Sequence, residues 1–263
     1  KIMPTTKKII TKQYGIIGHP LVHSYSPTFF NEKFTQKGLK SEYKAFDIAS
    51  IEAFPTIVQE HPLMRGFNVT IPYKQAVMPY LNEIDANAAA IGAVNVVKVE
   101  EKDGKPYLTG YNSDWYGFTR SLQPLLKPWH TKALVLGTGG ASKAIIYALT
   151  QLGIAYKLAS RTPREGQFSY QDITPAVMQE YTIIINTTPV GTFPNTKECP
   201  NIPYEYITDR HLVFDLIYNP IRTLFLQQAE MKGATIRNGW EMFVYQALRS
   251  YQIWEGVEWT HQF

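Results

Sequence analysis

The sequence has little of several features that would place it in a class at once. Its single cysteine, Cys199, excludes an intrachain disulfide and a thiolate metal cluster. No segment approaches the roughly 18 consecutive apolar residues that a membrane helix requires. The polar and basic stretch Lys1–Gln13 lacks the apolar core of a signal peptide. We therefore expect a soluble, cytoplasmic protein without a membrane partner.

Clustered positive charge is also missing. Lysine and arginine number 26 against 22 acidic residues, which gives a net charge of +4, but no block of basic residues accompanies it. A nucleic-acid partner is therefore not expected, and a small anionic ligand fits this charge better. Histidine, cysteine and carboxylates do not gather at metal-ligand spacings either, so we expect no metal.

What is present is enough apolar material for two cores. The chain has 263 residues, of which 44% are hydrophobic and 18% charged, so we expect about two folded domains. In the first half, the apolar run Tyr14–Gly18 predicts a buried strand. Ser26 followed by Pro27 predicts a capped helix that stops at Gly38. The turn pair Asp103-Gly104 predicts a hairpin between Val94–Val99 and Pro106–Tyr111, and hence a mixed sheet with at least one antiparallel edge.

The second half alternates strands with helices. This pattern is typical of a doubly wound parallel sheet that has helices on both faces. The expected strands are Ala133–Leu136, Tyr156–Ala159, Ile183–Ile185 and Leu212–Leu216, with a helix over Ala141–Leu152. Apolar residues at helical spacing predict a last helix from Gly239 to about Trp254.

A glycine turn stands between the first of these strands and its helix. In Gly137-x-Gly139-Gly140-Ala141, the first glycine permits a tight turn and the second lets the backbone approach a pyrophosphate at the helix N-terminus. Ser142 stands where a third small residue is usual. The context favours a dinucleotide site over a plain strand–helix turn.

The next strand ends in Ser160-Arg161-Thr162, with Arg164 just beyond. A site for NAD would carry a carboxylate here to bind the ribose 2′-hydroxyl. Arginine can instead stack on adenine and pair with a 2′-phosphate, so we expect NADP. The alternative is that these are ordinary solvated loop arginines.

The segment from Phe67 to Lys74 carries most of the polar information in the first half. In an extended strand, Asn68 and Thr70 share one face. Pro72 ends the strand and can start a helix, which would put Lys74 in a first helical turn, where the dipole disfavours a cation. Such a place is unusual for a purely structural lysine.

Candidate partners of Lys74 follow strand ends or turns. They are Asn95, Asn112 and Asp114. Asn95 and Asn112 have turn or cap roles as the alternative to a ligand role. Asp114 precedes the helical run Trp115–Leu122, so it is also a candidate helix N-cap.

Together these segments resemble the shikimate dehydrogenase family over nearly the whole chain. The motifs that carry the resemblance are Gly18-His19-Pro20, His23-Ser24-Tyr25-Ser26-Pro27, Asn68–Lys74, Gly92–Asn95, Asn112-Ser113-Asp114, Gly137–Ala141, Ser160-Arg161-Thr162 and Asp215-Leu216-Ile217-Tyr218. Each motif is short, but their order and spacing are very specific.

The resemblance implies an α/β protein with a cleft between two domains. Residues 1–113 and 239–263 would form a mixed-sheet substrate domain, and residues 114–238 a Rossmann-type NADP domain. The implied activity is the reversible NADPH-dependent reduction of 3-dehydroshikimate to shikimate, a step of chorismate and aromatic amino acid biosynthesis.

The resemblance also implies roles for individual residues. The catalytic pair would be Lys74, as proton donor or acceptor, and Asp114. Substrate would be bound by Ser24, Ser26, Asn68, Thr70, Asn95, Tyr218 and Gln246. The cofactor would be bound by Gly137, Gly139, Gly140, Ala141, Ser160, Arg161, Thr162, Arg164 and Gly239.

Some positions depart from the family pattern. Ser113 and Ser160 keep hydrogen-bonding capacity where threonine and asparagine are usual. Arg164 lies one place earlier than the expected second phosphate arginine. Glu241 replaces a glycine near the expected nicotinamide site, and Gln246 has an alternative role as a polar surface residue.

Other functions remain open from the sequence. One is a quinate or mixed quinate/shikimate dehydrogenase, which would differ on the Ser24 and Ser26 side. Another is a non-catalytic sensor that binds shikimate or NADP, although Lys74 and Asp114 favour an enzyme. We expect a monomer or a homodimer.

Overall fold

A computed structural model describes residues 9–22 and 24–261, so His23 of the serine motif lies outside the described residues. The chain forms two compact units. The first unit ends at Asn112 and also contains Ser250–Glu258, whereas the second contains Ser113–Arg249. The last helix, α8 (Trp240–Glu255), therefore contributes to both units.

The first unit is built on a six-stranded sheet with the order β2-β1-β3-β5-β6-β4. Its elements are β1 (Lys12–Gly18), α1 (Ser26–Gln36), β2 (Ser41–Asp47), α2 (Phe54–Glu60), β3 (Met64–Val69), β4 (Glu83–Ile84), α3 (Ala86–Ile91), β5 (Val96–Lys102) and β6 (Lys105–Tyr111). Strand β1 pairs in parallel with β2 and β3, and β5 pairs antiparallel with β3 and β6. The expected mixed sheet and hairpin are confirmed, and the short β4 occupies the edge beside the hairpin.

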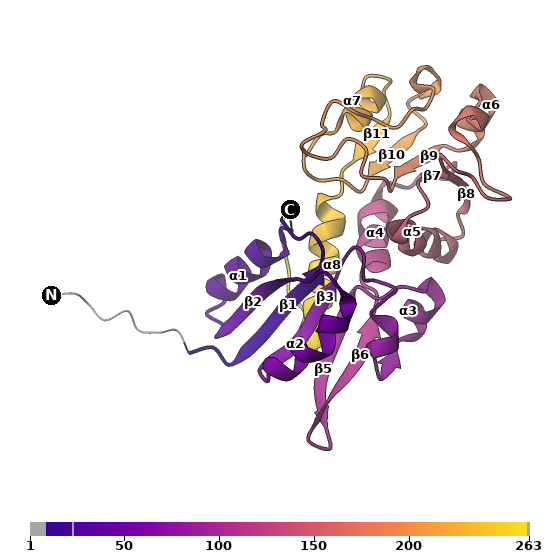
Figure 1. Cartoon of the computed structure of the whole chain (residues 1–263). Coiled ribbons are helices and arrows are strands. Elements are labelled where there is room, and N and C mark those ends of the chain that lie inside the picture. Colours follow the sequence, from indigo (N-terminus) through magenta and orange to yellow (C-terminus); the bar gives the residue numbers. More distant parts are fainter. Residues whose placement is uncertain (1–8, 23, 262–263) are drawn as a thin grey trace. The chain divides into compact units, whose positions relative to one another are not determined.

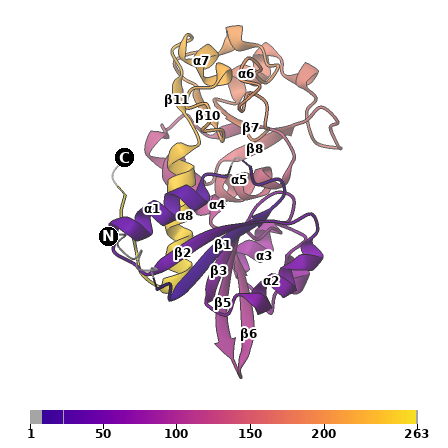
Figure 2. The same ribbon diagram turned by 60° about the vertical axis from the view of Figure 1, so that its left-hand side comes forward.

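Helices cover both faces of this sheet (Figure 2). On one face, Ile17, Phe67 and Val69 pack with Phe54 of α2 and Ala88 of α3. On the other face, alternate strand residues meet α1 and the end of α8 in a cluster of rings, formed by Tyr14, Phe30, Phe34, Tyr43, Tyr251 and Trp254. The period of two along each strand thus assigns its side chains to two separate cores.

The second unit contains a five-stranded parallel sheet with the order β11-β10-β9-β7-β8. Its elements are α4 (Asp114–Leu122), β7 (Lys132–Leu136), α5 (Gly140–Gln151), β8 (Ala155–Ala159), α6 (Pro175–Glu180), β9 (Ile183–Asn186), β10 (Leu212–Asp215), α7 (Leu224–Glu230) and β11 (Thr235–Arg237). Apolar residues of α4 and α5 pack on one face, and those of α6 and α7 on the other. The doubly wound arrangement expected from the sequence is confirmed (Figure 1).

Two local expectations are wrong. Ser26 does not cap α1, because the N-cap position is held by Tyr25 and no side chain caps the helix. No α-helix follows Pro72 either: the chain forms turns there, and the next helical segment is the short 3-10 helix Met78–Tyr80. The Lys74 carbonyl accepts a hydrogen bond from the amide of Val94, so it is not used by a helical turn.

Among the described helices, none combines the length and the apolar character needed to cross a membrane.

Candidate functional site

In the first unit, the predicted polar residues gather at one end of the sheet. Because β1 and β3 run in parallel, the loop after Gly18 and the segment after Val69 leave the sheet at the same end. Strand β5 runs the opposite way, so Asn95, which precedes it, lies at that end too: the Val69 amide donates to the Asn95 carbonyl at 2.8 Å. Ligands of open α/β sheets bind outside the carboxyl ends of strands.

Asn68 is the centre of a buried polar network at this end. Its side chain is 6% exposed. Its Nδ2 donates to Ser250 Oγ at 2.9 Å and to the Asn95 carbonyl at 3.3 Å, while its Oδ1 accepts from the hydroxyl of Tyr43 at 2.8 Å. The structure therefore brings the Asn68 side chain and the Asn95 backbone together.

The loop that carries Ser24 is anchored by Asp47 at the end of β2. Asp47 Oδ2 accepts from the amide of Leu21 at 2.9 Å, and its Oδ1 lies 2.6 Å from Nδ1 of His19. These two hydrogen bonds lower the pKa of the Asp47 carboxyl, that from the Leu21 amide most. The Ser24 amide donates to the Leu21 carbonyl at 3.0 Å, so the loop folds back on itself before α1.

Lys74 is held by its backbone rather than by a helix. Its carbonyl accepts from the amide of Val94 at 2.7 Å, and the amide of Tyr73 donates to the Thr70 carbonyl at 2.9 Å. The dipole argument made for Lys74 from the sequence therefore does not apply. The bond to Val94 nevertheless places the Lys74 backbone beside the residue that precedes Asn95, and both Lys74 and Thr70 are half-buried.

The glycine turn of the second unit combines a left-handed residue with open space at a helix N-terminus. Gly137 adopts φ +103°, a left-handed conformation that other residues rarely take. Around Gly139 and Gly140, a Cβ atom would meet nothing within 4 Å, so open space lies against the N-terminus of the 12-residue helix α5. Ser142 fits the turn because its hydroxyl donates to the Gly139 carbonyl at 2.7 Å.

The end of β8 is followed by two exposed arginines, Arg161 and Arg164, and then by the exposed Glu165. The Gly137 amide donates to the Ala159 carbonyl at 2.8 Å, so this strand end lies directly beside the glycine turn. Ser160 is buried and its hydroxyl accepts from the Thr162 amide at 3.2 Å, whereas Arg161 and Arg164 are exposed. Exposed guanidinium groups on the loop after this strand end can pair with a phosphate.

Asp215, at the end of β10, organises the loop that leads to Tyr218. It is fully buried and accepts from Thr223 Oγ1 at 2.6 Å, from the Ile217 amide at 3.1 Å and from Asn186 Nδ2 at 3.1 Å. Burial raises the pKa of this carboxyl to about 6, against the opposing effect of these hydrogen bonds. Tyr218 then packs its ring 5.1 Å from that of Phe243.

The remaining predicted residues of the second unit lie on α4 and α8. Asp114 is the first residue of α4, with Ser113 at the N-cap position, so Asp114 lies in the first turn, where the dipole favours a carboxylate. Ser113 Oγ donates to Oε1 of Gln246 at 3.4 Å. Gly239 lies so close to the Leu216 carbonyl that a Cβ would come within 1.9 Å of that oxygen.

Two further positions singled out in the sequence have defined partners in the structure. Asn112 Nδ2 donates to the Ala93 carbonyl at 3.0 Å, a turn-fixing contact of the kind considered for it. Glu241 forms an i,i+4 ion pair with Arg237, so the carboxylate that replaces the usual glycine has a cationic partner.

Sequence reasoning missed Tyr43. Its ring is 2% exposed in β2, and its hydroxyl reaches Asn68. The available signal was its place at a buried position of the strand, since a buried tyrosine hydroxyl needs a polar partner. The sequence alone did not indicate which partner that would be.

Comparison with known proteins gives consistent results. The family model described as "Shikimate dehydrogenase substrate binding domain" matches residues 16–97. The shikimate dehydrogenase (NADP(+)) of Methanococcus maripaludis strain S2 is 36% identical over 264 residues, which covers 94% of this chain and 93% of the relative.

Solved structures agree with this. The crystal structure of shikimate dehydrogenase from Aquifex aeolicus has a TM-score of 0.83 at 35% identity, covering 95% of this chain and 94% of that one. The Thermus thermophilus enzyme in complex with NADP(H) and shikimate has a TM-score of 0.81 at 30% identity, with 94% of both chains covered.

A quinate dehydrogenase from Corynebacterium glutamicum in complex with NAD is also similar, with a TM-score of 0.83 at 26% identity over 94% of this chain and 95% of that one. The alignment with the curated relative covers 94% of this chain and therefore includes both units. On this ground the chain belongs to the shikimate dehydrogenase family.

Proposed function

We propose that this chain catalyses the reversible NADPH-dependent reduction of 3-dehydroshikimate to shikimate, in the cytoplasm, as a step toward chorismate and the aromatic amino acids. The observation that carries the proposal is the gathering of Asn68, Thr70, Lys74 and Asn95 at one end of the first sheet, in a chain of this family. Amide, hydroxyl and ammonium groups are the donors and acceptors that a polyhydroxylated ring acid requires.

We assign substrate binding to residues 1–113 and 239–263. The carboxylate of the substrate would bind the hydroxyls of Ser24, Ser26 and Tyr218. The ring hydroxyls would bind Asn68, Thr70, Asn95 and Gln246. The buried network around Asn68 supports this assignment, because it holds the side chain in one orientation.

We assign NADP binding to residues 114–238, with Gly239 at their border. The open space at Gly139 and Gly140 fits a pyrophosphate, and Ala141 lies in the first turn of α5. Ser160, Arg161, Thr162 and Arg164 would hold the adenosine end, and the two guanidinium groups favour a 2′-phosphate over a bare ribose.

The protein's part in the reaction is placement and proton transfer. Bound NADPH supplies the hydride. The Lys74 ammonium would stabilise the negative charge that develops on the carbonyl oxygen and give that oxygen a proton. Asp114 would orient Lys74 and hold a neighbouring hydroxyl of the substrate.

A four-way assay tests the proposal. Purified protein is given shikimate or quinate, each with NADP⁺ or NAD⁺, and the absorbance of the reduced nicotinamide is followed. We expect the fastest turnover with shikimate and NADP⁺. Turnover with no combination would contradict the enzyme proposal and favour a binding protein, which calorimetry with shikimate would then detect.

Quinate is the second candidate substrate, because the similar structures include a quinate dehydrogenase. Preference for quinate in the same assay would reassign the substrate while leaving the reaction type unchanged. The two ligands differ around the carbon that bears the carboxylate, so Ser24 and Ser26 are the positions at which selectivity would arise.

A further inference from the structure

The side-chain amide of Asn68, on β3, is hydrogen-bonded to three other segments of the first unit. Tyr43 of β2 donates its hydroxyl proton to Oδ1 of Asn68 at 2.8 Å. Nδ2 of Asn68 donates to Ser250 Oγ, on α8, at 2.9 Å and to the backbone carbonyl of Asn95 at 3.3 Å. Asn68, Tyr43 and Ser250 are each less than a tenth exposed, so these bonds are shielded from water.

The Asn95 carbonyl determines which end of the Asn68 amide faces which partner. A carbonyl oxygen can only accept, whereas the hydroxyls of Tyr43 and Ser250 can donate or accept. Exchanging the two ends of the amide would place Oδ1 against the Asn95 carbonyl, with no proton between the two oxygens. Nδ2 therefore faces Asn95 and Ser250, and Oδ1 faces Tyr43.

This arrangement uses most of the hydrogen-bonding capacity of the amide. A primary amide has two donor protons and two acceptor lone pairs. Among the described residues, Ser250 and Asn95 take the two protons and Tyr43 takes one lone pair. The second lone pair of Oδ1 is what Asn68 can offer to a ligand. Asn68 can therefore accept a hydrogen bond from a ligand, but it has no proton to give.

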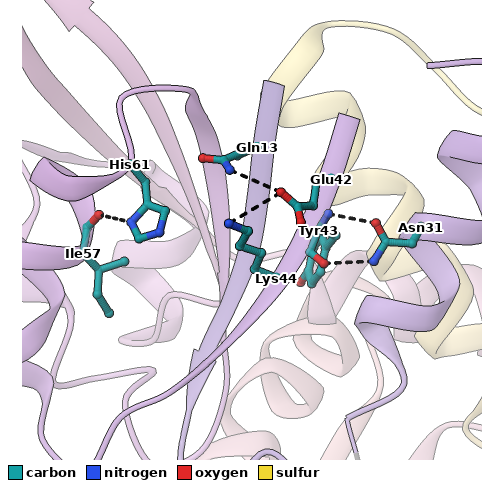
Figure 3. Close-up of polar contacts among 7 residues, drawn as sticks. All are labelled: Gln13, Asn31, Glu42, Tyr43, Lys44, Ile57 and His61. Carbon is teal, nitrogen blue, oxygen red and sulfur yellow. Dashed lines mark hydrogen bonds and ion pairs between the residues drawn. The ribbon is translucent and has the colours of Figure 1, made fainter. Parts of the chain in front are cut away.

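The Tyr43 hydroxyl is held in place from two sides. Its ring stacks on Phe30 of α1, with 4.6 Å between centroids and planes 9° apart. Its backbone is bound by Asn31 of the same helix, which donates from Nδ2 to the Tyr43 carbonyl and accepts at Oδ1 from the Tyr43 amide, both at 2.9 Å (Figure 3). Helix α1 thus fixes the phenol that donates to Asn68.

Ser250 is held in place by the packing of α8. Trp254 lies one helical turn beyond it and donates from Nε1 to the Val97 carbonyl of β5 at 3.0 Å. The indole also packs on Gly66, at the start of the strand that carries Asn68. Helix α8 is therefore fixed against β3 and β5, and the acceptor for Nδ2 is fixed with it.

We propose that Tyr43 and Ser250 are positioning residues that restrict Asn68 to accepting a hydrogen bond, so that this position selects a ligand with a hydroxyl donor. The inference rests on the proposed function, which assigns a ring hydroxyl of the substrate to Asn68. A ligand without a proton there leaves a buried acceptor facing another acceptor or an apolar group, which weakens its binding.

The restriction also indicates which hydroxyl Asn68 binds. The carbon that is reduced carries a carbonyl oxygen in 3-dehydroshikimate, and a carbonyl has no proton to donate. Asn68 therefore binds a hydroxyl that the reaction leaves unchanged. Its contribution to binding is then the same for 3-dehydroshikimate and for shikimate.

Double-mutant cycles with Asn68 test the positioning role. Tyr43→Phe and Ser250→Ala are made in the wild type and in Asn68→Ala, and kcat and KM for shikimate are measured at saturating NADP⁺. In the wild type we expect each change to raise KM by about tenfold and to change kcat by less than about twofold. In Asn68→Ala neither should raise KM further, because both residues act through that amide. Undiminished KM effects in Asn68→Ala, or an unchanged KM in both single variants, would overturn the proposal.

Tyr14→Phe is the matched control. Tyr14 is buried in the same unit, and its hydroxyl donates to Glu255 Oε1 at 2.7 Å rather than to Asn68. The variant also loses a buried hydroxyl bond, so its melting temperature should fall as that of Tyr43→Phe does. Its KM should stay within about twofold of the parent in both backgrounds. Equal KM effects of the two tyrosine changes would mean that Tyr43 acts only through stability, which would overturn its positioning role.

A second arm changes the ligand and needs no variant at Tyr43 or Ser250. Each ring hydroxyl of shikimate that does not react is replaced in turn by fluorine, which has a similar size but no proton. Dissociation constants are measured by calorimetry with wild type and Asn68→Ala. For one analogue, we expect wild type to bind about tenfold more weakly than it binds shikimate, and Asn68→Ala to cause no further loss. Equal losses on Asn68→Ala for shikimate and for every analogue would contradict an acceptor role.

Turnover in both directions locates the hydroxyl. Asn68→Ala should raise KM by the same factor for shikimate with NADP⁺ and for 3-dehydroshikimate with NADPH. A rise for shikimate alone would place Asn68 at the reacting oxygen and overturn the inference. An absence of wild-type turnover with shikimate would instead contradict the proposed function, and the calorimetric arm would still test the acceptor role.

Discussion

At the scale of single residues, hydrogen bonds to backbone groups hold several of the charged and polar residues in position. Lys74 is an example, since the bond from Val94 to its carbonyl holds it in a turn. Asp47 is another, since it fixes the loop of Ser24 through the Leu21 amide. A catalytic role and a binding role for such a residue can be distinguished by measuring turnover and ligand binding separately.

Replacing Lys74 by alanine tests its proposed role. We expect kcat to fall by about 10²- to 10⁴-fold, the usual contribution of a general acid–base group. The dissociation constant for shikimate should change by only a modest factor, as measured by calorimetry. Lys44→Ala, at an exposed ion pair with Glu42 in the same unit, is the control. Equal turnover of wild type and Lys74→Ala would remove Lys74 from the mechanism.

Asp215 gives a prediction about pH. Its pKa is raised by burial to about 6, from an ordinary value of 3.8, so the folded state holds this proton more tightly than the unfolded state does. Its contribution to the free energy of unfolding therefore falls as pH rises from about 4 to about 6. In Asp215→Asn, an amide oxygen can still accept from Ile217, and this part of the pH dependence should vanish. Urea unfolding between pH 4 and 7 measures it, and identical slopes for the two proteins would contradict the assignment.

At the scale of elements, much of the architecture could be predicted from the sequence. The strand at Tyr14, the hairpin at Asp103-Gly104 and the glycine turn before α5 follow from local patterns. Local patterns failed at two positions. Tyr25 rather than Ser26 holds the N-cap position of α1, and the Lys74 carbonyl accepts from the distant Val94 amide rather than from a helical turn.

The candidate site was predictable to a similar extent. Spacing and family resemblance indicated which residues lie at strand ends, because the position of a strand end depends on neighbouring residues in the sequence. Tyr43 was missed because its role arises from contacts with α1 and β3, which pattern and propensity do not encode. The residue roles themselves are predictions that the assays above address.

The end of α8 gives a prediction about stability. Trp254 packs on β3 at Gly66, where a Cβ would come within 2.1 Å of the indole nitrogen, and its Nε1 donates to the Val97 carbonyl at 3.0 Å. Trp254→Phe should lower the free energy of unfolding by about 2–4 kcal/mol, from lost packing and an unsatisfied carbonyl. Chemical denaturation measures this. Trp129→Phe, at a partly exposed tryptophan, is the control, and equal losses would mean that burial at Gly66 is unimportant.

At the scale of the whole molecule, two buried histidines make the second unit sensitive to acid. His211 Nδ1 accepts from the Thr208 amide while its Nε2 donates to the Met178 carbonyl, and His130 is held in the same way by Lys127 and Arg210. Both rings are therefore neutral in the fold. Burial, chiefly, lowers the pKa of each below 6.5.

Acidification should consequently destabilise the protein. The stability contributed by the neutral rings is present above the ordinary histidine pKa of about 6.5 and is lost as pH falls below it, because the unfolded chain then binds protons that the folded chain does not. His211→Gln should reduce the loss of stability between pH 7 and pH 5, as measured by urea unfolding. An unchanged acid dependence in that variant would show that His211 titrates alike in both states. Below about pH 6, protonation of Asp215 increases the free energy of unfolding as pH falls, which opposes the effect of the histidines. The His211→Gln change is therefore also measured in the Asp215→Asn background.

The division of α8 between the units has a consequence for biosynthesis. The ring cluster under β1 requires Tyr251 and Trp254, and Glu255 accepts the hydroxyl of Tyr14. These three residues are translated after Ser113–Arg249 of the second unit. Folding of nascent chains generally proceeds from the N-terminus, domain by domain. The first unit is different. Its residues up to Asn112 are translated first, but the apolar face that Tyr251 and Trp254 cover is completed only after Glu255 has been translated.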